Sequence, residues 1–330
     1  MREALLHQIN NIETQDFTKV SLAIFHYQAT HNALYRKYLQ LLGCRVAEVQ
    51  QIADIPFLPI SLFKNYQIQT GEWKAVRSFS SSGTTGQTTS KHHLRSLRLY
   101  DETCRKIFKH FYGDPQDYCF LALLPSYLER EGSSLVYMVD QFIQDSRYAE
   151  SGFFLDNQAA LIQRLEACQT KGIPTVLIGV SFALWDLAKQ YSRDLSNIII
   201  METGGMKGRA KEITRTELHQ ILGNAFQLRH IHSEYGMTEL LSQAYAKEAG
   251  LFHPAPTMKV QARQISDPLS LEKIGRTGAL NIIDLANLDS CAFIATDDLA
   301  KVYEDGSFEV LGRLDDSEIR GCNLMITDIL

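Results

Sequence analysis

Residues 80–91 read Ser-Ser-Ser-Gly-Thr-Thr-Gly-Gln-Thr-Thr-Ser-Lys, a polar run followed by a helix-like segment. Small residues around Gly83 and Gly86 let a backbone approach a phosphate closely and point its N–H groups at it. The hydroxyls add donors, and Lys91 adds a positive charge. Composition alone equally describes a flexible Ser/Thr-rich surface loop. The spacing excludes a Walker loop, because the second glycine of that pattern would fall on Thr88 or on Lys91.

The composition around this run is that of a globular protein. The chain has 330 residues, 45% of them hydrophobic and 22% charged, which excludes disordered, collagen-like and coiled-coil classes. The formal net charge of -5 argues against a general nucleic-acid binder, which needs a basic face. Six cysteines without a Cys-x-x-Cys pair fit neither a disulfide scaffold nor a structural zinc site. The longest uncharged apolar stretch, 173–185, is too short to span a bilayer. We expect a cytoplasmic protein without membrane insertion.

Helix-period and strand-like segments alternate along the chain, which predicts an α/β fold. After residue 255 the pattern changes to short alternating strands and a hairpin at Asp305-Gly306. We therefore expect an α/β body over 1–255 and a β-rich subdomain over 256–330. The expected helices are 2–42, 97–111, 156–171 (with Asp156 as N-cap and Gly172 as its end) and 182–191; the expected buried strands of the body are 118–124, 175–180 and 197–201.

Three later motifs follow the polar run in a fixed order. Residues 233–239 read Ser-Glu-Tyr-Gly-Met-Thr-Glu, residues 295–298 read Ala-Thr-Asp-Asp, and residues 312–316 read Gly-Arg-Leu-Asp-Asp. Together with Ser-Ser-Gly-Thr-Thr-Gly, this series resembles the adenylate-forming superfamily, which activates acyl and aryl acids. One departure is Asp297, which stands where that superfamily has glycine.

The resemblance implies a set of ligand contacts. A tyrosine ring offers adenine a flat surface to stack on, and a carboxylate oxygen suits Mg²⁺. Taken singly, each of the residues named next also fits a core position or a solvated turn, and the pair Gly204-Gly205 also fits a plain tight turn. The implied set is Ser82, Gly83, Thr84, Thr85 and Gly86 for the β,γ-phosphates, Gly204, Gly205, Tyr235 and Gly236 for adenine, Thr238 for the α-phosphate, Glu239 for Mg²⁺, and Asp298 and Arg313 for the ribose.

Three further segments look like one branch of that superfamily, the acyl-protein synthetases (fatty-acid–luciferin-component ligases). They are 55–59, 124–130 and 320–325. The branch implies mixed sheets layered with helices, as in the large N-terminal part of adenylate-forming enzymes, with the β-rich C-terminal subdomain and no cap domain. It also implies acyl transfer to a cysteine near the C-terminus. Cys322 fits, since it lies in a polar stretch beside Arg320, although an inert cysteine in a tail is an equal reading.

The expected function is activation of a carboxylic acid, a fatty acid in this branch, by ATP and Mg²⁺. The acyl group then passes to the Cys322 thiol for delivery to a partner acyl reductase. Because the cap lysine of the superfamily has no counterpart in this sequence, Lys91 is a candidate to neutralise charge on the α-phosphate. Two alternatives remain: a coenzyme A ligase, and a non-catalytic module that binds a nucleotide or an acyl chain.

Overall fold

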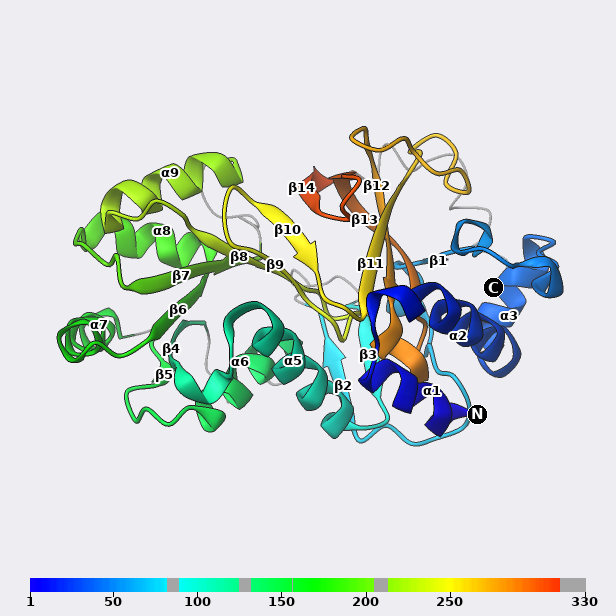
Figure 1. The fold of residues 1–330 in the computed structure, drawn as a ribbon, viewed down its shortest axis with the longest axis horizontal. Helices are drawn as coiled ribbons and strands as arrows, with labels where there is room; N and C mark the ends of the chain where they lie inside the picture. The colour runs from blue at the N-terminus through cyan, green and yellow to red at the C-terminus, as the bar shows by residue number, and fades with distance from the viewer. Residues whose placement is uncertain (82–88, 125–131, 156, 205–212, 315–330) are drawn as a thin grey trace. The chain divides into compact units, whose positions relative to one another are not determined.

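The computed structural model describes residues 1–81, 89–124, 132–155, 157–204 and 213–314, and Figure 1 shows its ribbon. The chain divides into two compact units, which are described separately. The first unit contains Met1–Thr103, Thr238–Ser242 and His253–Leu330. The second contains Cys104–Met237 and Gln243–Phe252.

The second unit is built on a sheet in the order β5-β4-β6-β7-β8-β9. The strands from β5 to β8 run parallel, and β9 is antiparallel to β8. Its strands are β4 (Cys119–Leu123), β5 (Gly152–Phe153), β6 (Thr175–Val180), β7 (Ile198–Thr203), β8 (His232–Tyr235) and β9 (Ala244–Ala246). Its helices are η4 (Pro115–Asp117), α6 (Ser134–Asp145), α7 (Gln158–Lys171), α8 (Ser181–Gln190) and α9 (Arg215–Phe226). Helix α5 (Leu97–Tyr112) and strand β10 (Leu251–Pro254) cross from one unit to the other.

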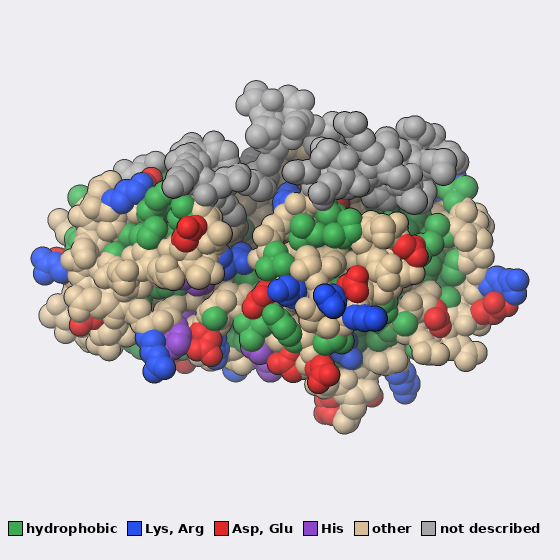
Figure 2. All heavy atoms as spheres, turned by 90° about the horizontal axis from the view of Figure 1, so that it is seen from above, with side chains coloured by type: hydrophobic (Ala, Val, Ile, Leu, Met, Phe, Trp, Pro, Cys, Tyr) green, Lys and Arg blue, Asp and Glu red, His purple; other side chains and the backbone are tan. Residues whose placement is uncertain are grey.

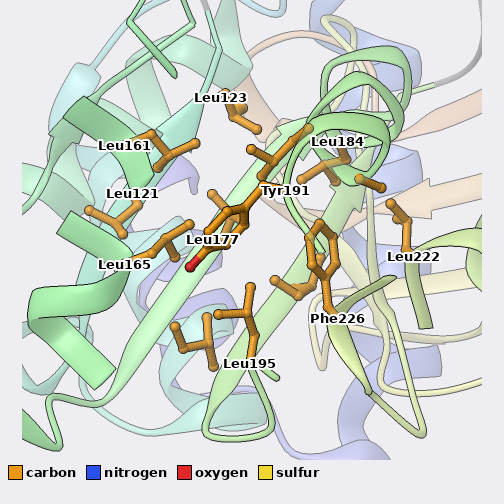
Figure 3. Packing of buried hydrophobic residues seen from close by; sticks show 14 of the residues in the cluster. Leu121, Leu123, Leu161, Leu165, Leu177, Leu184, Tyr191, Leu195, Leu222 and Phe226 are labelled. Carbon is orange, nitrogen blue, oxygen red and sulfur yellow. The ribbon is translucent and has the colours of Figure 1, made fainter. Parts of the chain in front are cut away.

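Helices cover both faces of this sheet, as Figure 1 shows. Leu121 of β4 belongs to a buried cluster with residues of α7, α8 and α9, drawn in Figure 3. The neighbouring Phe120 contacts Phe108 of α5 and Phe142 of α6, with ring centroids 5.4 Å apart in both pairs. Successive strand residues point to opposite faces, so a strand buried on both faces reads as an unbroken apolar run.

The ends of α7 show how local sequence fixes a helix. The Asn157 side chain accepts a hydrogen bond from the Ala160 N–H, which caps the first turn. Gly172 ends the helix in the left-handed conformation at φ 64°, as predicted. The predicted N-cap was Asp156, which lies outside the described residues, and the cap that the structure shows is its neighbour Asn157.

The first unit contains an antiparallel sheet in the order β11-β12-β13-β14, with β1 parallel to β13. A separate hairpin pairs β2 with β3 on either side of the polar run. The strands of the first unit are β1 (Leu58–Pro59), β2 (Arg77–Ser80), β3 (Lys91–Leu94), β11 (Met258–Arg263), β12 (Thr277–Asp284), β13 (Phe293–Val302) and β14 (Phe308–Arg313). Its helices are α1 (Arg2–Asn10), η1 (Thr14–Asp16), α2 (Phe17–His31), α3 (Ala33–Leu41), η2 (Val46–Glu48), η3 (Ile52–Asp54), α4 (Leu62–Asn65) and η5 (Leu285–Asp289).

The segment 2–42, predicted to be helical, is divided in the structure. It contains three α-helices and the short η1, and Asn32 separates α2 from α3 with an extended backbone. Its side chain accepts from the Tyr35 N–H and so begins α3. The break lets Phe25 and Tyr35 both pack against Phe293 of β13, with ring centroids about 6 Å apart.

These contacts join the N-terminal helices to the C-terminal strands in one unit. The predicted boundary at residue 255 instead groups residues 1–103 with the α/β body. The difference arises because Phe25 and Phe293 meet in a core that no local pattern reports. The expected function of each part stays a prediction.

The surface carries charges of both signs. On the face shown in Figure 2, the described acidic and basic side chains are interspersed, with apolar side chains between them. Within the described ranges, none of the helices has the length and apolar character needed to cross a bilayer.

Candidate functional site

The segment Thr238–Ser242 in the first unit contains two predicted site residues and lies outside helices and strands. Side chains from other elements bind its backbone instead, as buried backbone groups require. The Glu239 carbonyl accepts from Asn287 Nδ2 at 2.8 Å. The Asp284 carboxylate accepts from the backbone N–H groups of Leu241 and Ser242 at 2.8 and 2.9 Å, and from the Ser242 hydroxyl at 2.6 Å. The segment therefore has a fixed path.

His92 makes a further contact with this segment. The ring is 1% exposed on β3, and Nδ1 lies 2.9 Å from the Thr238 carbonyl oxygen. On its other side, Nε2 lies 2.9 Å from the Ser290 hydroxyl. Burial lowers the pKa of His92 to about 4, so the ring is neutral near pH 7.

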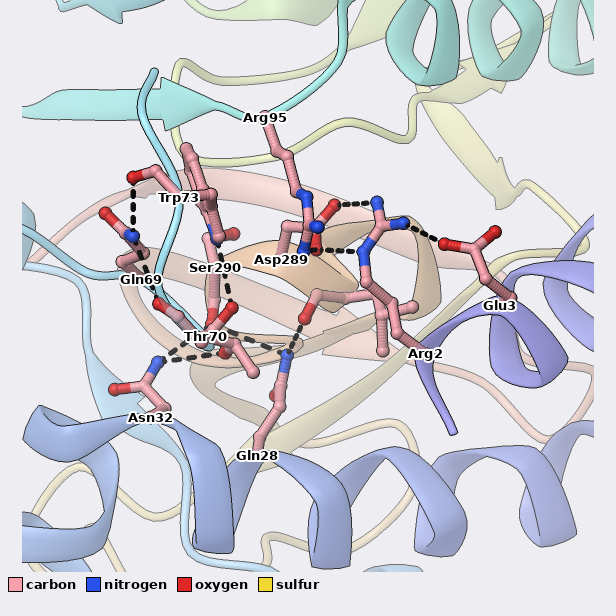
Figure 4. Close-up of polar contacts among 12 residues, drawn as sticks. Arg2, Glu3, Gln28, Asn32, Gln69, Thr70, Trp73, Arg95, Asp289 and Ser290 are labelled. Atoms are coloured by element: carbon pink, nitrogen blue, oxygen red, sulfur yellow. Dashed lines mark hydrogen bonds and ion pairs between the residues drawn. The ribbon is translucent and has the colours of Figure 1, made fainter.

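Helix η5, which supplies Asn287, is itself held by the N-terminal helices, as Figure 4 shows. Gln28 of α2 donates to the carbonyls of Asn287 and Leu288 at 2.9 and 3.1 Å. Arg2 donates from Nε and one terminal nitrogen to the two carboxylate oxygens of Asp289, at 2.6 and 2.5 Å. This forked geometry fixes direction as well as distance. Residues near the start of the chain thus support the segment that contains Glu239.

Three predicted ligand residues of the first unit come together. Glu239 is 5% exposed; burial raises its pKa, a hydrogen bond from Ser90 opposes that rise, and the charges of Arg313 and Asp298 act on it in opposite directions. Asp298 and Arg313 are paired in register on β13 and β14, and Arg313 Nε donates to Asp298 at 3.1 Å. Two carboxylates and one guanidinium therefore share one electrostatic neighbourhood.

Asp297, the departure from the superfamily pattern, adds a further carboxylate to this neighbourhood. Burial raises its pKa, and the positive charges of Arg313 and Arg263 oppose that rise. Its carbonyl also accepts from the Leu314 N–H at 2.7 Å. The charges of Arg313 and Arg263 thus partly offset the burial of this aspartate, which stands where the superfamily has glycine.

The second unit holds the other half of the 233–239 motif. Tyr235 ends β8, is 7% exposed, and has its ring 5.7 Å from that of Phe252. Thr203 Oγ1 donates to Glu234 at 2.5 Å. Burial raises the pKa of Glu234 to about 7, and the nearby Glu202 charge adds to the rise. A Cβ on Gly236 would lie 2.5 Å from Glu234 Oε1, so a larger residue there would have to displace the Glu234 carboxylate.

Glu202, at the end of β7, organises a second buried polar group. It accepts from Ser181 at 3.1 Å and from Arg215 at 2.8 Å. Burial disfavours its charge, but His219 and Arg215 outweigh burial and lower its pKa. Gly204 follows at φ 74°, in the conformation that favours glycine, and its carbonyl accepts from Ser181. Both polar groups lie at the carboxyl ends of parallel strands, where open α/β sheets place ligands.

The remaining predicted residues have different outcomes. Lys91 is exposed and begins β3, paired in register with Ser80. Among the described residues, no group of three or more His, Cys, Asp or Glu side chains has the arrangement of a metal site. A single carboxylate such as that of Glu239 suits Mg²⁺, which commonly takes one or two protein carboxylates and completes its ligands with phosphates and water. Outside the described residues lie Ser82, Gly83, Thr84, Thr85, Gly86, Gly205 and Cys322.

Sequence reasoning missed the residues that support the motif segment. Ser90, Asn287 and Asp284 reach it from elements that lie more than 40 residues away along the chain. Asp284 alone leaves a local signal, because it is a charged residue at the end of an apolar strand run. Ser90 lies in the polar run 80–91 but was not singled out there, and Asn287 has no pattern that distinguishes it from an ordinary polar residue.

Solved structures with the same fold are adenylate-forming enzymes. ATP-bound MatB from Rhodopseudomonas palustris has 15% identity and a TM-score of 0.55, with 72% of this chain and 48% of that chain covered. AMP-bound O-succinylbenzoate coenzyme A synthetase (MenE) from Bacillus subtilis has 16% identity and a TM-score of 0.52, covering 75% and 50%. A 2-hydroxyisobutyryl-CoA ligase has 12% identity and a TM-score of 0.67, covering 94% and 70%. The chain spans about half the length of the first two.

These similarities confirm the predicted α/β fold with a β-rich C-terminal part. A search of curated proteins with the sequence found no match. The family described as "Acyl-protein synthetase, LuxE" matches residues 9–330, which is nearly the whole chain. The chain therefore belongs to the LuxE acyl-protein synthetase family.

Proposed function

We propose that this protein is an acid–thiol ligase that first activates a carboxylic acid with ATP. An oxygen of the substrate carboxylate attacks the α-phosphorus, the bond to the β-phosphate oxygen breaks, and pyrophosphate leaves with that electron pair. The product is an acyl-adenylate. Family membership supports this reaction, and a fatty acid is the proposed substrate.

The observation that carries the proposal is the grouping of Glu239, Asp298 and Arg313 in one electrostatic neighbourhood. Asp298 would accept from the ribose hydroxyls and Arg313 would donate to the ribose oxygens. Thr238, one residue before Glu239, would contact the α-phosphate. MatB with bound ATP and MenE with bound AMP have the same fold, which agrees with a nucleotide site.

Glu239 is the residue that would hold Mg²⁺. When bound, Mg²⁺ would neutralise negative charge on the phosphates. Hydrogen bonding by Ser90 and the Arg313 charge both favour the ionised form of this carboxylate, since both lower its pKa. Backbone N–H groups of the loop from Ser82 to Gly86 would hold the β,γ-phosphates, and exposed Lys91 would supply a cation near the α-phosphate. Tyr235, Gly204, Gly205 and Gly236 would contact adenine.

In the second half-reaction, the Cys322 thiolate attacks the acyl carbon. The S–C bond forms, the bond from that carbon to the AMP oxygen breaks, AMP leaves with the electron pair, and the thiol proton passes to solvent. A thiolate attacking a mixed anhydride needs little beyond correct positioning. The thioester would then deliver the acyl group to a partner acyl reductase in the cytoplasm.

The first test is exchange of labelled pyrophosphate into ATP across a panel of fatty and aromatic acids. We expect exchange that depends on both the acid and Mg²⁺, with the fastest rate for a fatty acid. Absence of exchange with every acid would contradict acid activation and favour a module that only binds its ligands.

The second test follows a labelled acyl group. It should stay on the denatured protein, be released by neutral hydroxylamine, and be lost in Cys322→Ser. Cys44→Ser is the matched control, since Cys44 is a partly exposed free thiol whose pKa burial raises. Label retained in the Cys322 variant would exclude that residue as the acceptor.

A coenzyme A ligase is the second candidate. The 2-hydroxyisobutyryl-CoA ligase with bound coenzyme A covers 94% of this chain, which supports a diffusible thiol. Adding coenzyme A to the labelled reaction distinguishes the two. Rapid appearance of acyl-CoA, with no label on protein, would favour this candidate.

A further inference from the structure

His92 connects the strand that leaves the polar run to the segment that contains Thr238 and Glu239. Its ring lies on β3, two residues after Ser90, whose side chain lowers the pKa of Glu239. His92 contacts the Thr238 carbonyl directly, and Ser90 acts on the neighbouring Glu239 carboxyl.

The hydrogen-bond partners determine which ring nitrogen carries the proton. A carbonyl oxygen only accepts, so Nδ1, 2.9 Å from the Thr238 oxygen, must donate. In a neutral ring Nε2 is then an acceptor, and the Ser290 hydroxyl donates to it at 2.9 Å. The other acceptor near that hydroxyl, the Asn287 carbonyl, lies 3.5 Å away. Ser290 therefore favours the Nδ1–H tautomer.

The ring has little freedom to leave this arrangement. It is 1% exposed, its ring centroid lies 5.8 Å from that of Phe63 in an edge-on contact, and its backbone pairs in register with Phe79. Ser290 is itself held, because its carbonyl accepts from Asn32 and Thr70 at 2.8 and 2.6 Å. The Thr238 carbonyl thus has a donor in a fixed place.

We propose that His92 is a positioning residue: its Nδ1–H fixes the Thr238 carbonyl and thereby orients Thr238 and Glu239 toward the phosphates and Mg²⁺ of MgATP. This inference rests on the proposed acid activation. Small displacements of positioned groups lower reaction rates by up to about 100-fold, so the contact matters to the rate even though His92 touches no substrate.

Two amide variants separate the two ring contacts. His92→Asn places an amide donor near the Nδ1 position and keeps the hydrogen bond to the Thr238 carbonyl. His92→Gln places its amide toward Ser290 and loses the hydrogen bond to the Thr238 carbonyl. Both bury one amide in place of one ring, so their costs in stability are comparable. We expect kcat of pyrophosphate exchange to fall about 10- to 100-fold in His92→Gln, and to stay within about fivefold of the wild type in His92→Asn. KM for the acid should not change in either variant.

His93→Asn and His93→Gln are the matched controls. His93 is the next residue of the same strand, is partly buried, and contacts Ser78 at 2.6 Å instead of the Thr238 segment. Both controls should leave kcat within about twofold. Thermal unfolding of all four variants measures any general destabilisation.

The outcomes distinguish this inference from the proposed function. No exchange by the wild type with any acid would overturn acid activation, and this inference with it. Exchange by the wild type with equal kcat in the Asn and Gln variants at His92 would overturn the positioning role alone. A loss of kcat that follows the fall in unfolding temperature across all four variants would do the same.

Discussion

Asp298 and Arg313 allow a test of ribose binding at the scale of single residues. Asp298 is 8% exposed and bonded to Arg313, so its carboxylate is already oriented without ligand. If it accepts from the ribose hydroxyls, the wild type should use ATP with a KM about tenfold or more below that for 2′-deoxy-ATP, since a hydrogen bond to a charged group contributes about 1.5 kcal/mol or more. In Asp298→Ala the two KM values should converge. Pyrophosphate exchange measures both.

Glu309→Ala is the control for this comparison. Glu309 is a partly buried carboxylate on the same strand as Arg313, paired in register with Lys301. It should keep the wild-type ratio of the two KM values. An unchanged ratio in Asp298→Ala would mean that this carboxylate does not contact the ribose.

Site residues could be proposed from the sequence where they form a motif of consecutive residues, and their roles stay predictions. Gly236 belongs to such a motif, and the structure adds that a Cβ there would lie 2.5 Å from Glu234 Oε1. Glu234 itself lies within the motif, yet nothing in the sequence indicates that its carboxylate is buried beside Thr203. Burial of a charge depends on which elements pack around it, which the sequence of one segment does not report.

Asp284 provides a test at the scale of a structural element. Its buried carboxylate accepts four hydrogen bonds, two from Leu241 and Ser242 backbone, one from the Ser242 hydroxyl and one from the Ala286 N–H. Asp284→Asn would place an amide donor among these donors, and hydrogen bonds to a charged group contribute about 1.5–3 kcal/mol each. We expect the free energy of unfolding to fall by about 2–3 kcal/mol, measured by urea denaturation, and KM for MgATP to rise.

Asp267→Asn is the matched control for this substitution. The Asp267 carboxylate lies in an exposed turn and accepts from the Leu269 N–H and the Ser270 hydroxyl. Its loss should change the free energy of unfolding by less than about 1 kcal/mol. Equal effects of the two variants would show that the segment after Thr238 does not depend on Asp284.

Elements were predictable in proportion to the strength of their local pattern. The strand Thr175–Val180 has the predicted bounds because its apolar run is buried on both faces. The helix ending at Gly172 was also predictable, since its capping residues are local. The break at Asn32 was not, because the apolar periodicity continues across it and packing against Phe293 decides the geometry.

At the scale of the whole molecule, the two units are made of segments that alternate along the chain. Residues 1–103 join the C-terminal strands, while Thr238–Ser242 is a short return to the first unit between two parts of the second. The motif at 233–239 therefore has Tyr235 in one unit and Glu239 in the other. One boundary drawn along the sequence cannot represent this arrangement. Each point where the chain passes from one unit to the other leaves no change in composition that would mark it.

Glu234 gives the stability of the whole molecule a specific dependence on pH. Its pKa is about 7 in the folded protein against an ordinary value near 4.5, owing to burial and the Glu202 charge. The contribution of Glu234 to the free energy of unfolding is therefore fully present below pH 4.5. It is lost as pH rises through 7, by on the order of 3 kcal/mol in total. His92, with its lowered pKa, acts oppositely, as stability falls when pH drops below 6.5.

Glu234→Gln isolates this contribution, because every other titrating group is shared with the wild type. The amide oxygen can still accept from Thr203, and no charge develops as pH rises. We expect the variant to gain stability relative to the wild type between pH 5 and pH 8, by on the order of 2–3 kcal/mol, measured as the difference between their urea unfolding curves. Glu166→Gln, on the exposed face of α7, should show no such trend. A constant difference between wild type and Glu234→Gln over this range would mean that the Glu234 carboxyl ionises at its ordinary pKa, and that burial between Thr203 and Gly236 does not disfavour its charge.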